Sequence, residues 1–110
     1  AMYFTSPLRI PENKRLAAME FFTRANYDML NGNFELDLRD GEFRYKVCQN
    51  FVGAQVSIET ILVMYLVAVH SMQRYFDGVV HVVYSGKEPA AAVRACESAD
   101  SAQEPSSSQQ

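Results

Sequence analysis

The chain has 110 residues, enough for one domain with its own hydrophobic core but too few for two independent ones. With 48% hydrophobic and 21% charged residues its composition is that of a globular protein, and its net charge of −3 gives no electrostatic reason to bind nucleic acid. The most apolar run, residues 61–69, is far shorter than the roughly 20 residues that cross a bilayer, so we expect no membrane partner either.

Residues 11–30 predict an amphipathic helix. Pro11 and Glu12 suit a first helical turn, and Gly32 suits the left-handed position that follows a helix. Apolar residues recur at helical spacing and predict one buried face: Ala18, Phe22, Ala25 and Met29, widened by Met19 and Leu30.

The segment NGNFELDLRDGEFRYKV, residues 31–47, carries four acidic and three basic side chains. Asp40 followed by Gly41 is a preferred pair for a two-residue type I′ turn, which fixes the register of a β-hairpin. Counting outward pairs the following residues: Arg39 with Glu42, Leu38 with Phe43, Asp37 with Arg44, Leu36 with Tyr45, Glu35 with Lys46 and Phe34 with Val47. The charged side chains of the strands then share one face and the apolar ones the other.

Two interpretations of these charges are open. Glu35 and Asp37 could act as catalytic or metal-binding carboxylates, or they could belong to the solvated face of the hairpin. Each acid faces a base in this register, which keeps a carboxylate ionised instead of raising its pKa, and no histidine lies nearby. The solvated face is the better explanation.

A second helix is predicted from Ser57, a good N-cap, to Phe76, where Asp77 and Gly78 interrupt it. One apolar stripe is predicted to face the sheet: Ile58, Ile61, Leu62, Tyr65, Val69, Met72 and Phe76. Val63, Met64, Leu66 and Val67 lie outside this stripe, so the middle of the helix is apolar nearly all round. Such a helix needs cover on a second side.

Residues 79–86 have the β-branched composition of a strand, although so short an apolar run also fits a helix. Residues 87–97 predict a short helix with Pro89 near its first turn. The Ser- and Gln-rich end, residues 98–110, lacks large apolar side chains, and we expect a disordered tail after a domain that spans residues 1–97.

No motif for catalysis or for a metal or cofactor is present. His70 and His81 stand outside any ligand or nucleophile pattern, and Cys48 and Cys96 are too isolated for a metal-binding pair. We therefore expect no enzyme activity and no cofactor. The two cysteines form no disulfide framework, which favours a reducing compartment.

Two stretches resemble the YbjN-domain family, described as bacterial sensory transduction regulators. They are RIPENKRLAAMEFFTRANYDMLNGNFELDLRDGEFRYKV and, further on, RYFDGVVHVVYSGKEPAAAV, and the resemblance covers roughly residues 3–97. It implies an α+β fold like that of type III secretion chaperones, with an antiparallel sheet and helices on one face, and it favours a helix for residues 79–85. Many family members carry two further strands before the segment that matches residues 2–11.

The resemblance brings no catalytic residues. We expect a noncatalytic protein-binding module, a chaperone or assembly factor that captures a segment of a client protein, in bacterial cytoplasm or a plastid stroma. The alternative is a small-molecule-responsive regulator with a ligand pocket between the helices and the hairpin. We also expect a homodimer, because two-fold dimers are the commonest way to cover a surplus apolar helix. The residues predicted to bind a partner or a second copy are Val63, Met64, Leu66, Val67 and Met72, with a sheet edge at Tyr3, Phe4 and Leu8.

Overall fold

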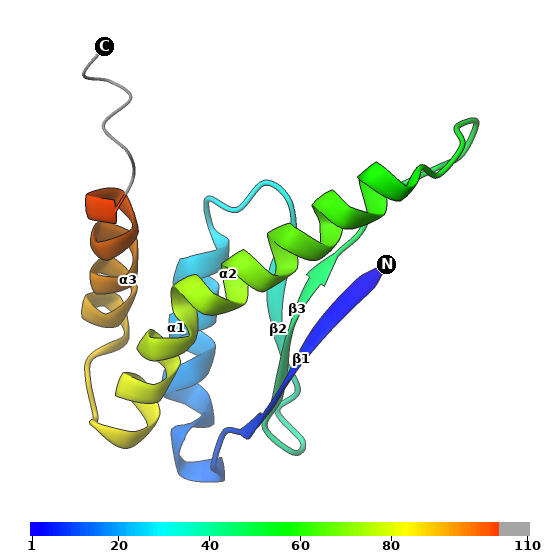
Figure 1. Ribbon diagram of the computed structural model, residues 1–110. Helices are drawn as coiled ribbons and strands as arrows, with labels where there is room; N and C mark the ends of the chain where they lie inside the picture. The colour runs from blue at the N-terminus through cyan, green and yellow to red at the C-terminus, as the bar shows by residue number, and fades with distance from the viewer. Residues whose placement is uncertain (104–110) are drawn as a thin grey trace.

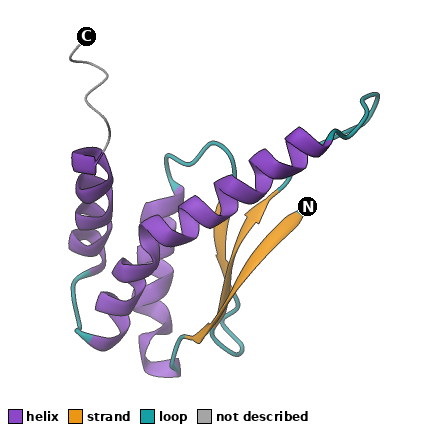
Figure 2. Ribbon diagram, in the orientation of Figure 1, coloured by secondary structure: helices purple, strands orange, loops and turns teal. Residues whose placement is uncertain are grey.

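The computed structural model describes residues 1–103, which form a three-stranded antiparallel sheet and three α-helices: the first two helices cover one face of the sheet, and the third packs against these two helices (Figure 1). In chain order the elements are β1 (Met2–Arg9), a 3-10 turn (Glu12–Lys14), α1 (Arg15–Asn26), β2 (Asn33–Leu36), β3 (Glu42–Val47), α2 (Ile58–Tyr84) and α3 (Pro89–Gln103). β3 lies in the middle of the sheet between β1 and β2 (Figure 2). The predicted α+β class is confirmed.

The hairpin of β2 and β3 forms, but its register differs from the predicted one by two residues. Glu35 lies opposite Arg44 instead of opposite Lys46. Because side chains alternate along a strand, a shift of two residues changes every partner but leaves each side chain on its predicted face. The charged face and the apolar face are therefore as predicted, and the pairs are not.

The turn explains the shift. A type I′ turn needs positive φ at both central residues, and among the described residues positive φ occurs at glycine alone, so Asp40 does not adopt it. Gly41 has a φ of 81° and its N–H donates to the carbonyl of Asp37 (2.8 Å), which closes a longer loop. The N–H of Ile10 donates to the carbonyl of Gly41 (2.8 Å), so the end of β1 holds this loop in place.

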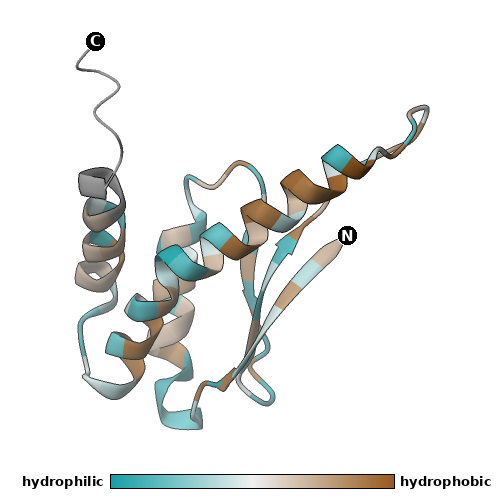
Figure 3. Ribbon diagram, viewed as in Figure 1, coloured by the Kyte–Doolittle hydropathy of each residue, from teal (hydrophilic) through white to brown (hydrophobic). Residues whose placement is uncertain are grey.

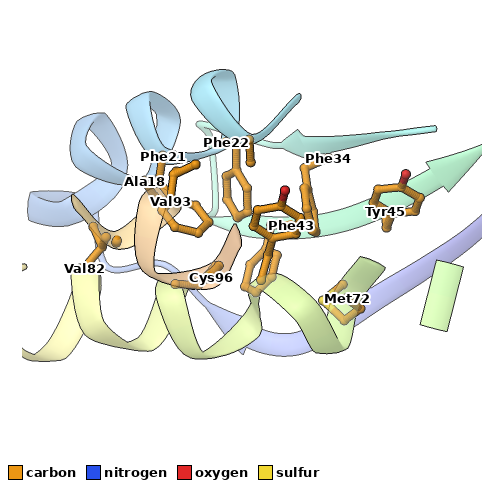
Figure 4. Packing of buried hydrophobic residues seen from close by; sticks show 14 of the residues in the cluster. Ala18, Phe21, Phe22, Phe34, Phe43, Tyr45, Met72, Val82, Val93 and Cys96 are labelled. Atoms are coloured by element: carbon orange, nitrogen blue, oxygen red, sulfur yellow. The ribbon is translucent and has the colours of Figure 1, made fainter. Parts of the chain in front are cut away.

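The core is an aromatic cluster between the sheet and the helices (Figure 4). Ring centroids lie 5.1 Å apart for Phe22 and Phe34 and 5.2 Å apart for Phe22 and Phe43. The buried aromatic residues come from α1, the hairpin and α2: Phe21, Phe22, Phe34, Phe43, Tyr45 and Tyr75. These contacts fix α1 and α2 over the inner face of the sheet.

α1 ends at Asn26, earlier than predicted. The side chain of Asn26 accepts from the N–H of Phe34 (2.7 Å) and donates to its carbonyl (2.9 Å), which joins the end of the helix to β2. The prediction that Met19 and Leu30 widen the buried face is wrong, because both are exposed, Leu30 to 95%. Phe21, which the predicted stripe left out, is buried and widens this face on the opposite side from Met19 and Leu30.

α2 begins as predicted, with the Ser57 hydroxyl accepting from the N–H of Thr60 (3.1 Å). It then runs unbroken to Tyr84, so the prediction that it ends at Phe76 is wrong, and the helix that the resemblance favoured for residues 79–85 is confirmed. Within residues 1–103 no helix, α2 included, is long and apolar enough to cross a membrane.

Gly78 does not interrupt α2 because its missing side chain makes room for its neighbours. A Cβ built there would lie 2.6 Å from Sγ of Cys96 in α3 and 2.7 Å from the ring of Phe21 in α1. The glycine therefore lets three helices approach closely, which offsets its low helix propensity.

α3 runs to Gln103, past the predicted start of the tail at Ser98. It buries Ala92, Val93 and Cys96 against the other helices. The remainder of the predicted tail, residues 104–110, lies outside the described residues.

Candidate functional site

Glu35 is the centre of a charge network on the outer face of the sheet. Arg44 donates to Oε1 of Glu35 (2.8 Å) and Nζ of Lys46 lies 2.9 Å from Oε2. The Arg44 guanidinium also stacks 4.0 Å above the ring of Tyr3. The hydrogen bonds from Lys46 and then Arg44 lower the pKa of Glu35, so its carboxylate stays ionised and is unsuited to donate a proton in catalysis.

The other acids of the hairpin are paired as well. The side chain of Arg39 donates to Asp37 (2.8 Å and 3.0 Å), and these hydrogen bonds lower the pKa of Asp37 to about 2. Asp40 accepts from the N–H of Glu42 and from Arg9 (2.7 Å), which lowers its pKa too. The predicted pairing of Asp37 with Arg44 and of Arg39 with Glu42 is not formed, but the interpretation as a solvated, ion-paired face agrees with this geometry.

The histidines and cysteines are spread over the molecule. His70 and His81 lie at exposed positions of α2, and Cys48 is exposed at the end of β3. Cys96 is buried in α3, and burial raises the pKa of its thiol. Among the residues that the structure describes, no three side chains of the metal-binding types gather at one point.

Replacing Glu35 with Gln is expected to lower the free energy of unfolding by about 1 kcal/mol or less, because the two ion pairs lost are partly exposed. Since its pKa is lowered in the folded protein, Glu35 stabilises the fold above its ordinary pKa of 4.5, and the contribution is lost as the pH falls through the lowered value. Urea titrations at neutral and at acidic pH measure this. Glu20→Gln, which removes one exposed pair with Arg24 on α1, is the control with a smaller effect. A loss well above 1 kcal/mol would contradict the solvated-face interpretation.

The first turns of α2 form an exposed apolar projection, which we call the α2 arm (residues 58–66). In Figure 3 the most hydrophobic stretch of the helix runs along this arm, which stands clear of α1 and α3. Six large apolar side chains on it are exposed: Ile58, Ile61, Leu62, Val63, Tyr65 and Leu66. A surface of this kind is unusual on a monomer.

The predicted binding residues on α2 fall into two groups. Val63 and Leu66 are exposed, as expected for a surface that needs cover, and Val67 is half-buried. Met64 and Met72 are core residues, with exposed fractions of 8% and 6%. The expectation that Met64 lacks cover within the chain is therefore wrong.

The helix is rotated about its axis relative to the prediction. Its covered side is marked by Met64, Ala68, Met72, Tyr75 and Val79, which recur at helical spacing. The upper part of the predicted core stripe, from Ile58 to Tyr65, faces solvent instead, because the arm extends beyond the core and residues 1–103 place nothing over it. The binding candidates that periodicity alone assigned to the core are thus Ile58, Ile61, Leu62 and Tyr65.

β1 is an edge strand. It pairs with β3 on one side, and no strand of the described residues pairs with its other side. Tyr3 lies on the charged outer face, while Phe4 and Leu8 are half-buried on the face toward the helices. The predicted sheet edge at Tyr3, Phe4 and Leu8 is therefore present.

A small apolar groove lies between β1 and α2, with a volume of about 320 Å³. Phe4 lines it from the strand, and Gln73 and Asp77 are polar residues of its lining. The apolar lining from α2 consists of Val69, Met72 and Phe76. The groove thus continues the apolar surface of the arm toward the strand edge.

A second hollow, of about 480 Å³, lies between the helices and the hairpin. Tyr45 of β3, His70 and Arg74 of α2 and Glu97 of α3 line it together with the end of α1. The hydroxyl of Tyr75 donates to Glu97 (2.9 Å), and burial together with this hydrogen bond raises the pKa of the tyrosine. The hollow thus combines aromatic and charged groups.

No protein-family model, no curated protein and no solved structure matches this chain. The resemblance to the YbjN-domain family and to the fold of type III secretion chaperones stays a prediction.

Proposed function

We propose that this chain is a noncatalytic protein-binding module that captures an extended apolar segment of a client protein along β1. The observation that carries the proposal is the edge of β1, with which no strand of residues 1–103 pairs, next to the apolar groove of Phe4, Val69, Met72 and Phe76. A strand edge offers backbone hydrogen bonds to any extended chain, and pockets beside it select side chains.

The regular part of the edge is short. Residues 2–5 pair with β3 without interruption, and the register shifts between Thr5 and Arg9. Ser6 Oγ accepts from the N–H of Leu8 within this irregular part, and Pro7 has no N–H to offer. A client segment would therefore add its backbone along residues 2–5.

The two faces of the sheet define the client's side-chain pattern. Alternate side chains of an added strand would point toward the groove and toward the charged outer face. The groove holds one or two apolar side chains, and its flexible Met72 adapts to different shapes. On the outer face the client would meet Tyr3 and Arg44, which suits polar side chains. The preferred client is thus an extended segment with alternating apolar and polar residues.

We place this function in a reducing compartment, bacterial cytoplasm or a plastid stroma. Cys48 is exposed and unpaired with Cys96, and a free thiol at an exposed position persists where disulfides do not form.

Affinity purification from the native source tests the proposal, with the wild-type chain, Val69→Asp and Val52→Asp as baits. Val69→Asp puts a carboxylate into the groove, whereas Val52→Asp makes the same change at an exposed loop position. We expect wild type and Val52→Asp to recover one stoichiometric client, and Val69→Asp to recover at least about tenfold less of it with an unchanged circular dichroism spectrum.

Amide hydrogen exchange with the recovered client then locates the contact. Strand addition slows exchange along residues 2–5 of β1. Background proteins alone from all three baits, or equal recovery by Val69→Asp and wild type, would contradict the proposal.

The hollow of about 480 Å³ favours one second candidate, a regulator that responds to a small molecule. Its aromatic and charged lining from Tyr45, His70 and Arg74 has the size and mixed character of a ligand pocket. Native mass spectrometry of protein purified from its source decides this: a bound small molecule supports the regulator, and the bare chain mass argues against it.

A further inference from the structure

A hollow of about 310 Å³ lies between α3 and the C-terminal half of α2, the half remote from the α2 arm (Figure 1). Its lining from α3 consists of small side chains: Ala92, Ala95, Cys96 and Ala99. Gly78 of α2 adds a fifth small residue. Small linings leave space between the two helices, and the volume is at the lower end of the range for ligand pockets, about 300–1,000 Å³. The hollow therefore suits a small molecule.

The remaining lining of the hollow carries charges of both signs. Asp77 and, one helical turn later, His81 line it from α2, and Lys87 lines it from the loop before α3. The N–H of Lys87 donates to the carbonyl of His81 (3.1 Å), which fixes this loop at the end of the helix. The backbone of Lys87 is thus about 6 Å or more beyond Asp77 along the axis of α2, at roughly 1.5 Å per residue.

The two opposite charges are not paired with each other or with another side chain. Within residues 1–103 neither Asp77 nor Lys87 forms an ion pair. Both nevertheless act on the thiol of Cys96. Burial is the main cause of its raised pKa, and the charge of Asp77 raises this pKa further whereas that of Lys87 lowers it. A positive and a negative group therefore lie near the same point of the lining.

This arrangement disfavours a ligand with a single charge. An anion alone would be repelled by Asp77, and a cation alone would be repelled by Lys87 and by Arg74, which also lines the hollow. A zwitterion can place its ammonium group beside Asp77 and its carboxylate beside Lys87, in two charge-assisted hydrogen bonds.

The small lining from α3 defines the rest of the ligand. Ala95 and Ala99 offer apolar surface without filling the space in front of them. An aliphatic side chain on the zwitterion would cover these two alanines and leave water. We infer that the hollow binds a free α-amino acid with an aliphatic side chain, such as valine or leucine. This site goes beyond the proposed function, because capture of a client along β1 needs no small molecule.

Calorimetric titration of the full chain with leucine and two analogues tests the ligand class. Isopentylamine is leucine without its carboxylate, and isocaproate is leucine without its ammonium group. Leucine is expected to bind with a millimolar or lower Kd, and each analogue at least about tenfold more weakly, because each loses one charged hydrogen bond and leaves one repulsion. Equal binding of all three compounds, or no binding of leucine at about 10 mM, would overturn the inference.

Charge variants test the predicted contacts. Lys87→Gln and Asp77→Asn are each expected to weaken leucine binding at least about tenfold with an unchanged circular dichroism spectrum. Lys14→Gln is the matched control, since Lys14 lies in the turn before α1 and outside the lining. Because Asp77 also lines the client groove, Lys87→Gln separates the two sites and should leave client recovery unchanged. Equal weakening by Lys14→Gln and Lys87→Gln would contradict the proposed site.

Filling the hollow is an independent test. Ala95 is exposed, so Ala95→Phe should keep the fold and should abolish leucine binding by occupying the space of the ligand's side chain. Ser98→Phe makes a similar change at an exposed position of α3 outside the lining and should bind like the wild type. Amide chemical shifts measured by NMR during the titration should change around Gly78 and Lys87. Unchanged binding by Ala95→Phe, or shifts confined to residues outside the lining, would place the ligand elsewhere and refute the inference.

Discussion

Replacing Gly41 with valine is expected to lower the free energy of unfolding by at least about 3 kcal/mol. Gly41 has a φ of 81°, which strains a β-branched residue. A Cβ at this position would also collide with the carbonyl oxygen of Ile10, which accepts from Arg15 (3.1 Å). The substitution would thus strain the hairpin loop and break its attachment to β1.

Gly53→Val separates the strain of a positive φ from the collision with the carbonyl of Ile10. Gly53 has a similar φ of 78°, but nothing lies within 4 Å of a Cβ built there. It should therefore show the backbone strain alone, about 1–2 kcal/mol. Urea unfolding followed by circular dichroism compares the two variants. If both lose the same amount, the contact between Ile10 and Gly41 does not contribute as argued.

Truncating Phe21 to alanine is the other change with a large expected effect, about 3–5 kcal/mol. Phe21 is fully buried, and its ring meets those of Phe22 (5.5 Å) and Tyr75 (6.3 Å) edge-on. It also fills the space beside Gly78 where the three helices meet. Its removal would lose the transfer free energy of the ring and leave a cavity that the surrounding helices cannot close.

Leu16→Ala is the control on the same helix. Leu16 is 74% exposed, so its truncation should change the free energy of unfolding by less than about 0.5 kcal/mol. Chemical unfolding at several protein concentrations is needed, since a dimer makes apparent stability depend on concentration. A loss from Phe21→Ala of less than about 1 kcal/mol would contradict the packing described for α1, α2 and α3.

The hairpin shows which features the local sequence pattern predicts: the faces of the strands, but not the length of the loop. The alternation of charged and apolar residues placed the side chains of β2 and β3 on their observed faces, because a shift of two residues preserves alternation. Leu38 is the exception: it was predicted on the apolar face, but it lies in the loop and is exposed. The turn residues suggested a two-residue loop, and that was wrong. Ile10 lies in a distant part of the sequence, and its hydrogen bond to Gly41 could not be seen from the turn itself.

In α2, helical periodicity did not predict which side of the helix is buried. Its apolar residues surround the arm, so the helical pattern contains no single direction that must face the core. The structure covers the side of Met64 and Met72, and it exposes Leu62 and Tyr65. Asp77 and Gly78 were predicted to end the helix, but α2 continues through them because Gly78 packs closely against α1 and α3.

The sequence by itself determined the N-terminus of α2 at Ser57 and the two faces of the hairpin strands, because capping and alternation depend on neighbours along the chain. The α+β class was an expectation that the resemblance implied, and the structure confirms it. The tertiary structure alone decided the register of the hairpin, the continuity of α2 through Gly78 and the side of α2 that is covered. Each of these depends on contacts between segments far apart in the sequence, such as Ile10 with Gly41 and Phe21 with Gly78. The exposure of the α2 arm was also decided by the tertiary structure, because its apolar side chains are exposed only where the helix extends beyond the hydrophobic core.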